Sequence, residues 1–267
     1  MTFSFPRATV GALAEEARQA GYTGIELRIG RSHGHGLEID TPVAARKEAV
    51  RIAADAGVEL YSLAASHTLA VDPLDEADAR STLALAADLG SRVIRVFGGA
   101  FADSGLPFAD ARARLVAGLA RFGELAREET GADGVRIALE SHDAWTDPAE
   151  LAAVLDEVGR ANVGLNWDAY HIVRMTGQGV AAHFPAIAKH VTHVHFHDGQ
   201  ATNEAPVLAP IGTGIVDHAE LLRSLASISF DGYLMGEWIH SMMEGITDPV
   251  VYLPRELRRL KSIEAAL

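Results

Sequence analysis

Three histidines alternate along segment 191–199, which reads VTHVHFHDG, and an aspartate follows them directly. Imidazole and carboxylate groups spaced in this way can bind a metal ion, relay a proton or fill a polar core. On a β-strand, residues two apart share a face, so His193, His195 and His197 would point the same way. The outer two would lie roughly 13 Å apart, whereas a metal–nitrogen bond is about 2 Å long. One ion could therefore take either adjacent pair, and geometry leaves both open.

Acidic residues end three other short apolar segments in the second half of the chain. Glu140 closes VRIALE, Asp168 follows VGLNW, and Glu237 closes GYLMGE. With His195 they recur at intervals of about one βα repeat, the last interval including a longer loop. Three carboxylates and one imidazole suit Mn²⁺, Mg²⁺ or Co²⁺ better than a structural zinc ion. Carboxylates aimed at one point repel one another without a cation between them, so the set predicts a metal site.

The elements that must position these residues follow a repeating pattern. Helical stretches end in glycine, and a short β-rich run follows each glycine, as expected where glycine stops a helix. These stops are Gly21, Gly57, Gly90 and Gly131. Several helices are expected to begin with a capping side chain followed by proline, which has no N–H to lose. The pairs are Thr41-Pro42, Asp72-Pro73, Asp147-Pro148 and Asp248-Pro249.

Eight runs are expected to be strands: TFSF near the start, then GIEL, VELYSL, RVIRVF, VRIALE, NVGLNW, VTHVHF and GYLMGE. Strict alternation of strand and helix requires a parallel sheet. Eight such units in about 250 residues predict an α/β fold of the (β/α)8 TIM-barrel class, whose chemistry gathers at the carboxyl ends of the strands. An open doubly wound sheet is the alternative, but no Gly-x-Gly-x-x-Gly turn follows the first strand. Residues 1–267 are expected to form a single domain.

Composition narrows the class of function. The 267 residues include no cysteine and carry a formal net charge of −13. Disulfides, thiolate metal sites and cysteine nucleophiles are therefore excluded, and an acidic surface disfavours nucleic acid as a partner. No apolar run is long enough to span a membrane, and the first residues lack the features of a secretory signal. We expect a cytoplasmic enzyme without a nucleic-acid or membrane partner.

The chain resembles the xylose isomerase-like TIM-barrel family of sugar phosphate isomerases and epimerases. The resemblance covers nearly the whole chain and rests on AGYTGIELR, LESH, NWDAYH, HVHFHD, PIGTGIVD and GYLMGEW. It implies that a divalent ion is held by Glu140, Asp168, His195 and Glu237. Mn²⁺ is the expected ion, with Mg²⁺, Co²⁺ or Zn²⁺ as alternatives. The partner that the family implies is a small carbohydrate, and family members are often homo-oligomers, so a dimer or tetramer is expected.

The resemblance also implies the reaction. We expect a metal-dependent isomerase or epimerase that acts on a small unphosphorylated keto-sugar or keto-polyol through a metal-stabilised enediolate, with Glu140 and Glu237 as catalytic acid and base. An inosose-type dehydratase on the same site is the alternative. Ketose 3-epimerases carry an arginine shortly after the seventh-strand histidine, and HDGQATN has none, which weighs against a ketohexose substrate. A zinc abasic-site endonuclease is a remote alternative that would need more histidine ligands and a basic face.

Six further residues are expected to bind substrate or to support the site: His171, His142, Asp198, His67, Trp145 and Glu26. The family match selects His195 among the three alternating histidines. His193 is then expected in the core and His197 at the rim, while Asp198 would orient neighbouring groups or face the substrate. Loop 31–40 is a candidate lid, and its two histidines, at 33 and 35, are expected to lie in solvent.

Overall fold

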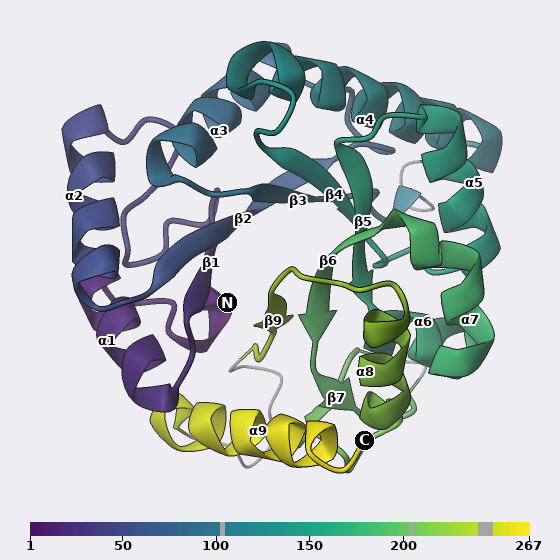
Figure 1. The fold of residues 1–267 in the computed structure, drawn as a ribbon. Helices are drawn as coiled ribbons and strands as arrows, with labels where there is room; N and C mark the ends of the chain where they lie inside the picture. The colour runs from purple at the N-terminus through teal and green to yellow at the C-terminus, as the bar shows by residue number, and fades with distance from the viewer. Residues whose placement is uncertain (102–104, 203–204, 240–247) are drawn as a thin grey trace.

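The computed structural model describes residues 1–101, 105–202, 205–239 and 248–267, in which seven parallel strands form a nearly closed barrel ringed by helices (Figure 1). In spatial order the strands are β1 (Gly24–Arg28), β2 (Glu59–Thr68), β3 (Val93–Phe97), β4 (Arg136–Glu140), β5 (Val163–Asp168), β6 (Val191–Phe196) and β9 (Leu234–Gly236). A two-stranded antiparallel sheet consists of β7 (Asp198–Gly199) and β8 (Leu208–Ala209). The predicted α/β TIM-barrel class is confirmed.

Helices alternate with the strands and cover the outside of the barrel. They are α1 (Val10–Ala20), α2 (Val43–Asp55), α3 (Glu76–Leu89), α4 (Phe108–Thr130), α5 (Pro148–Val158), α6 (Ala169–Thr176), α7 (Val180–Ile187), α8 (His218–Ser227) and α9 (Pro249–Glu264), with a short 3-10 turn, η3 (Ala188–His190), before β6. Glycines end α1, α3 and α4 as predicted. Asp147 and Asp248 cap α5 and α9 as predicted. At α3 the cap is Asp75, whereas Asp72 accepts a hydrogen bond from Thr68.

The prediction of a strand at TFSF is wrong. Thr2–Ser4 forms a 3-10 turn, η1, beside β1, and no ladder among the described residues joins β1 to β9. Thr2 Oγ1 accepts the N–H of Arg28 at 2.9 Å, and Ser4 Oγ donates to the carbonyl of Trp238 at 3.1 Å. Pro6, which directly follows the run, has no N–H to donate to a ladder. Side-chain hydroxyls therefore link this segment to β1 and to the chain that follows β9.

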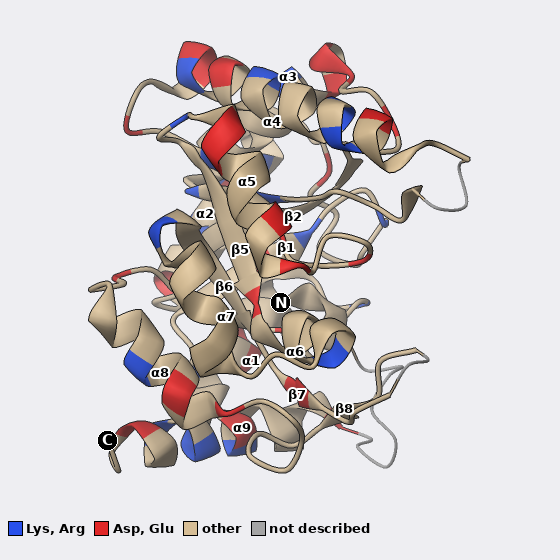
Figure 2. Ribbon diagram, turned by 90° about the vertical axis from the view of Figure 1, so that its right-hand side faces the viewer, with Lys and Arg blue, Asp and Glu red and all other residues tan. Residues whose placement is uncertain are grey.

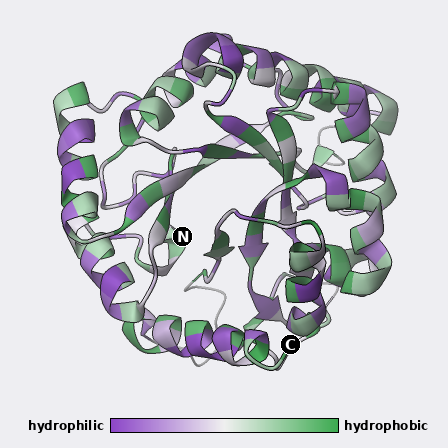
Figure 3. Ribbon diagram, in the orientation of Figure 1, coloured by the Kyte–Doolittle hydropathy of each residue, from purple (hydrophilic) through white to green (hydrophobic). Residues whose placement is uncertain are grey.

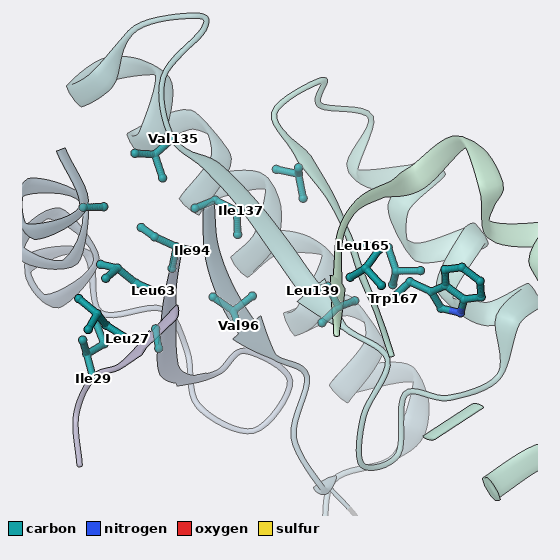
Figure 4. Packing of buried hydrophobic residues seen from close by; sticks show 14 of the residues in the cluster. Leu27, Ile29, Leu63, Ile94, Val96, Val135, Ile137, Leu139, Leu165 and Trp167 are labelled. Atoms are coloured by element: carbon teal, nitrogen blue, oxygen red, sulfur yellow. The ribbon is translucent and has the colours of Figure 1, made fainter. Parts of the chain in front are cut away.

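Side chains of the strands divide into two chemically different faces. One face is apolar and packs between the strands and the helices (Figure 4); its completely buried members include Leu27, Leu63, Ile94, Val96, Ile137, Leu139, Leu165 and Trp167. Successive residues of a strand alternate between faces, and the alternate residues here are largely polar. They include Glu26, Arg28, Ser62, Arg95, Glu140, Asn166, Asp168, His193 and His195. Figure 3 shows this mixture of hydrophobic and hydrophilic residues along the strands. The apolar core therefore surrounds a polar barrel interior.

Charged residues of both signs are interspersed on the outer helices (Figure 2). Arg121, for example, forms ion pairs with Glu76 and Glu124 at 2.7 and 2.8 Å. These pairs are exposed and contribute little to stability individually. Among the described residues, every helix is too short or too polar to cross a membrane.

Candidate metal centre

The barrel interior brings together the four residues predicted to bind a metal ion. One ligand atom each from Glu140, Asp168, His195 and Glu237 lies within 4.8 Å of the others, and all four residues are buried. Glu140 and Asp168 end β4 and β5, His195 lies near the end of β6, and Glu237 directly follows β9. Because these strands are neighbours in a parallel sheet, their carboxyl ends meet at one end of the barrel.

Nδ1 of His195 lies between two carboxylates. It is 3.0 Å from Oε1 of Glu140 and 2.9 Å from Oε2 of Glu237. Burial opposes a charge on His195, but Glu26, Glu140 and Glu237 raise its pKa well above the usual value. Burial likewise favours the neutral form of Glu237, but His195 lowers its pKa to about 2. Positive charge between the carboxylates is therefore favourable, and three carboxylates with one imidazole fit a hard divalent cation.

Asp168 is held from two sides. Its Oδ1 accepts the backbone N–H groups of Tyr170 and His171 at 3.0 and 3.3 Å, which caps α6. Its Oδ2 lies 2.7 Å from Nε2 of His197. Burial would raise the pKa of Asp168, but His197 and His171 hold it well below the usual range. His197 is thus buried against a carboxylate, which corrects its expected position at the rim.

A second group of polar side chains lies deeper in the barrel. Oε1 of Glu26 is 2.8 Å from Nε2 of His195, and Oε2 is 2.7 Å from Nε2 of His193. Ser62 donates its hydroxyl to Oε2 at 2.7 Å. All four residues are completely buried. His193 has the core position expected of it, and Glu26 supports the cluster from within the barrel.

Sequence reasoning missed Arg95. Its side chain is completely buried, its Nε lies 3.1 Å from Oε2 of Glu140, and its Nη1 donates to the carbonyl of Ala65 at 3.1 Å. The guanidinium also lies over the ring of Phe97, 3.9 Å from the ring centroid. An arginine inside the apolar run RVIRVF was the available signal, because alternation along a strand assigns it to one face.

His142 and His171 lie next to each other beside the cluster, with ring centroids 4.2 Å apart. Nε2 of His171 is 3.9 Å from Oδ2 of Asp168, and Nδ1 of His142 is 2.8 Å from Oδ1 of Asp143. Burial lowers the pKa of His171 to about 4. Burial also opposes the charge on His142, but Asp143 raises the pKa to about 9. At neutral pH the pair therefore offers one charged donor and one neutral imidazole.

Asp198 holds a loop, which differs from the substrate-facing role considered for it. Its Oδ1 accepts the N–H groups of Gly199 and Val216 at 2.9 and 3.2 Å. Its Oδ2 accepts those of Gly212 and Gly214, both at 2.9 Å. Both oxygens are occupied by backbone groups, so Asp198 orients the chain between β8 and α8.

His67 and Trp145 lie outside the cluster formed by Glu140, Asp168, His195 and Glu237. His67 packs on the ring of Phe122 at a centroid distance of 5.1 Å, and it lines a separate cavity of about 260 Å³. Trp145 is buried and donates from Nε1 to the carbonyl of Gly99 at 3.1 Å. His67 thus packs near the end of β2, and Trp145 packs in the segment after β4.

The candidate lid at 31–40 is tied to the rest of the barrel. The N–H of Gly34 donates to the carbonyl of Pro6 at 2.8 Å. His35 is buried, and its Nε2 lies 3.1 Å from the carbonyl oxygen of Arg28. The expectation that His35 lies in solvent is therefore wrong, because the backbone of β1 offers the imidazole a buried partner.

Comparisons with known proteins agree with this architecture. Residues 14–263 match the family model described as xylose isomerase-like TIM barrel. One similar structure is a D-allulose 3-epimerase from Methylomonas sp., with 20% identity, a TM-score of 0.73, and coverage of 98% of this chain and 96% of that chain. A second is a probable 3-DHS dehydratase from Bacillus anthracis, with 19% identity, a TM-score of 0.76, and 97% coverage of both chains.

A third similar structure is a xylose isomerase-like TIM-barrel protein from Mycobacterium smegmatis in complex with magnesium. It is 17% identical, has a TM-score of 0.72, and the match covers 97% of this chain and 90% of that chain. No curated protein matches the sequence. At these identities, the structural similarities establish the fold.

Proposed function

The chain belongs to the xylose isomerase-like TIM-barrel family, and from this premise we propose that it is a divalent-metal-dependent isomerase or epimerase of a small, unphosphorylated keto-sugar or keto-polyol. The observation that carries the proposal is the convergence of Glu140, Asp168, His195 and Glu237 within 4.8 Å in the barrel interior. Sugar epimerases and a magnesium-bound barrel among the similar structures support the same chemistry.

These four side chains would hold the ion, with Mn²⁺ expected and Mg²⁺, Co²⁺ or Zn²⁺ as alternatives. When bound, such an ion polarises a carbonyl group and makes the neighbouring C–H more acidic. The fit rests on the donor set, since hard carboxylate oxygens and one neutral imidazole suit these ions.

Glu140 and Glu237 would move the proton. Their oxygens approach Nδ1 of His195 at 3.0 and 2.9 Å, so the carboxylates converge on one point. Glu237 lies with Glu140 at the proposed ion, where an ionised carboxylate can accept a proton from carbon. Return of a proton to the other face of the same carbon gives an epimer, and return to the neighbouring carbon gives an isomer. His142 and His171 would bind substrate hydroxyl groups from beside the cluster.

An unphosphorylated substrate is supported by the way the interior arginines are occupied. Arg28 donates from Nη1 to the carbonyls of Ile29 and Ala64, and Arg95 contacts Glu140 and a backbone carbonyl. Arginine recognises phosphate best with two free parallel N–H groups. Arg95 directs both Nε and Nη1 at protein acceptors, so this guanidinium is poorly prepared to bind a phosphate ester.

The proposal is tested by incubating the Mn²⁺-loaded protein with a panel of ketoses and inososes in D₂O. We expect solvent deuterium at the carbon next to the carbonyl without loss of water. Glu140→Gln and Glu237→Gln should each slow this exchange by about 100-fold or more. Glu59→Gln, at an exposed position where β2 begins, is the matched control and should exchange like the unmodified protein. The proposal fails if no substrate exchanges and Glu140→Gln binds Mn²⁺ as tightly as the unmodified protein.

Dehydration on the same site is the second candidate, favoured by the similarity to a probable dehydratase at a TM-score of 0.76. Removal of the same proton would then be followed by expulsion of a β-hydroxyl group. The D₂O experiment distinguishes the reactions, because dehydration yields an unsaturated product that absorbs in the ultraviolet.

A further inference from the structure

Glu26 of β1 is a completely buried carboxylate with three donors around it. Nε2 of His195 lies 2.8 Å from Oε1, Nε2 of His193 lies 2.7 Å from Oε2, and the Ser62 hydroxyl donates to Oε2 at 2.7 Å. Burying an ionised carboxylate costs several kcal/mol unless it is well paired, and a buried ion pair is often no more stabilising than apolar packing. Stability alone therefore does not explain why a carboxylate is buried in contact with His195.

The role follows from the two nitrogens of His195. A neutral imidazole has one N–H donor and one lone-pair acceptor. An ionised carboxylate can only accept hydrogen bonds, so the nitrogen that faces Glu26 must carry a proton. That nitrogen is Nε2. The lone pair of the neutral ring then lies on Nδ1, the atom that faces Glu140 and Glu237.

We propose that Glu26 is the positioning residue of the metal site. It holds His195 in the tautomer and orientation that present Nδ1 to a divalent ion, while His193 and Ser62 hold Glu26 itself. The inference rests on the proposed function, since it takes the cluster to be a metal site. Partners of this kind typically change metal affinity by 10- to 100-fold when they are altered.

The first test compares Mn²⁺ affinities, measured from the electron paramagnetic resonance signal of free Mn²⁺. Glu26→Gln keeps the shape of the side chain but can turn an amide donor toward Nε2, which favours the opposite tautomer. We expect its dissociation constant for Mn²⁺ to rise about 10- to 100-fold. Ser62→Ala removes one donor to Glu26 but leaves the contact with His195, so a much smaller rise is expected.

Glu256→Gln is the matched control. Glu256 is also completely buried, but it lies in α9 and accepts the N–H of Ile211 at 2.7 Å. A purely structural effect of losing a buried carboxylate would lower thermal stability in both variants. We expect Glu256→Gln to lower stability without changing the Mn²⁺ dissociation constant.

The second test uses ¹⁵N NMR of the unmodified protein with Zn²⁺ bound, and so does not depend on whether a variant folds. We expect the His195 ring to carry its proton on Nε2 and the metal on Nδ1. A proton on Nδ1, or a folded Glu26→Gln that binds Mn²⁺ within twofold of the unmodified protein, would overturn the inference. If one of these results is obtained but Glu237→Gln still loses Mn²⁺ binding, the proposed function is retained and only the role of Glu26 is rejected. Absence of metal binding by the unmodified protein would overturn both.

Discussion

At the scale of single residues, the barrel interior consists of paired charges. Asp168 is paired with His197, and Glu140 with Arg95, in both cases almost without exposure to solvent. Carboxylates this close would otherwise repel one another, and one of them would take up a proton. Removing one member of such a buried pair typically costs 3–5 kcal/mol, because the remaining charge is left uncompensated. Substitutions here should therefore affect both folding and the metal binding that we propose, and each needs a measurement of both.

His171 provides a prediction of pH dependence. Burial lowers its pKa to about 4 in the folded protein, whereas the unfolded chain takes up this proton near pH 6.5. Protonation between these values therefore favours unfolding. In the metal-free protein this residue should reduce the free energy of unfolding by about 3 kcal/mol as the pH falls from 6.5 to 4.

Urea denaturation at pH 7, 6, 5 and 4 checks this prediction, with His171→Asn as the comparison. The variant has no titrating group at this position, so its stability should fall less steeply with decreasing pH. Identical pH profiles for the two proteins would show that His171 does not remain neutral in the folded state.

At the scale of elements, the carboxylate just beyond β6 organises the chain that leads to α8. Asp198 accepts four backbone N–H groups, two on each oxygen. Gly214 is required for this arrangement, since a Cβ there would lie 2.2 Å from Oδ1 of Asp198. The loop is thereby fixed to the strand that carries His195. Its contribution to the site is indirect, through the position of the strand end.

Asp198→Ala should release this loop. The four N–H groups would lose their acceptor, and we expect the free energy of unfolding to fall by about 2–4 kcal/mol. Hydrogen exchange should accelerate at the amides of Gly212, Gly214 and Val216. Asp217→Ala is the control: it removes the cap of α8 and should cost about 1 kcal/mol. If the three amides exchange equally in both variants, Asp198 does not hold the loop.

At the scale of the whole molecule, an apolar layer between strands and helices stabilises a barrel whose interior is largely polar. The turn η1, beside β1, hydrogen-bonds to Arg28 and Trp238. Glu140, Asp168 and Glu237 converge within 4.8 Å in this interior, so binding of a divalent ion between them should stabilise the entire fold. The predicted homo-oligomer stays a prediction.

Calorimetry of the protein after removal of metals tests this coupling. Mn²⁺ at 100 times its dissociation constant should add about 2.7 kcal/mol to the free energy of unfolding. For a chain of this length the midpoint of thermal unfolding should rise by roughly 5 to 10 °C. Glu237→Gln should show little of this rise. An unchanged midpoint for the unmodified protein at saturating Mn²⁺ would contradict a metal site in the barrel.

The sequence by itself determined the barrel class and the four strand-end residues. Glycine stops, capping aspartates and apolar runs are local signals, and parallel strands always bring their carboxyl ends to one end of a barrel. Glu140, Asp168, His195 and Glu237 could therefore be grouped without coordinates. The prediction failed at TFSF, where a strand was expected but Thr2–Ser4 forms a 3-10 turn shortly before Pro6.

Only the tertiary structure decided what each polar side chain faces. Glu26 and His195 are 169 residues apart in the sequence and 2.8 Å apart in the barrel, and no local pattern encodes that contact. Arg95 meets Glu140, and His197 meets Asp168, because neighbouring strands set the stagger of their side chains. The same stagger places Nδ1 of His195 between Glu140 and Glu237. The packing of the strands therefore determines which atoms meet at this point.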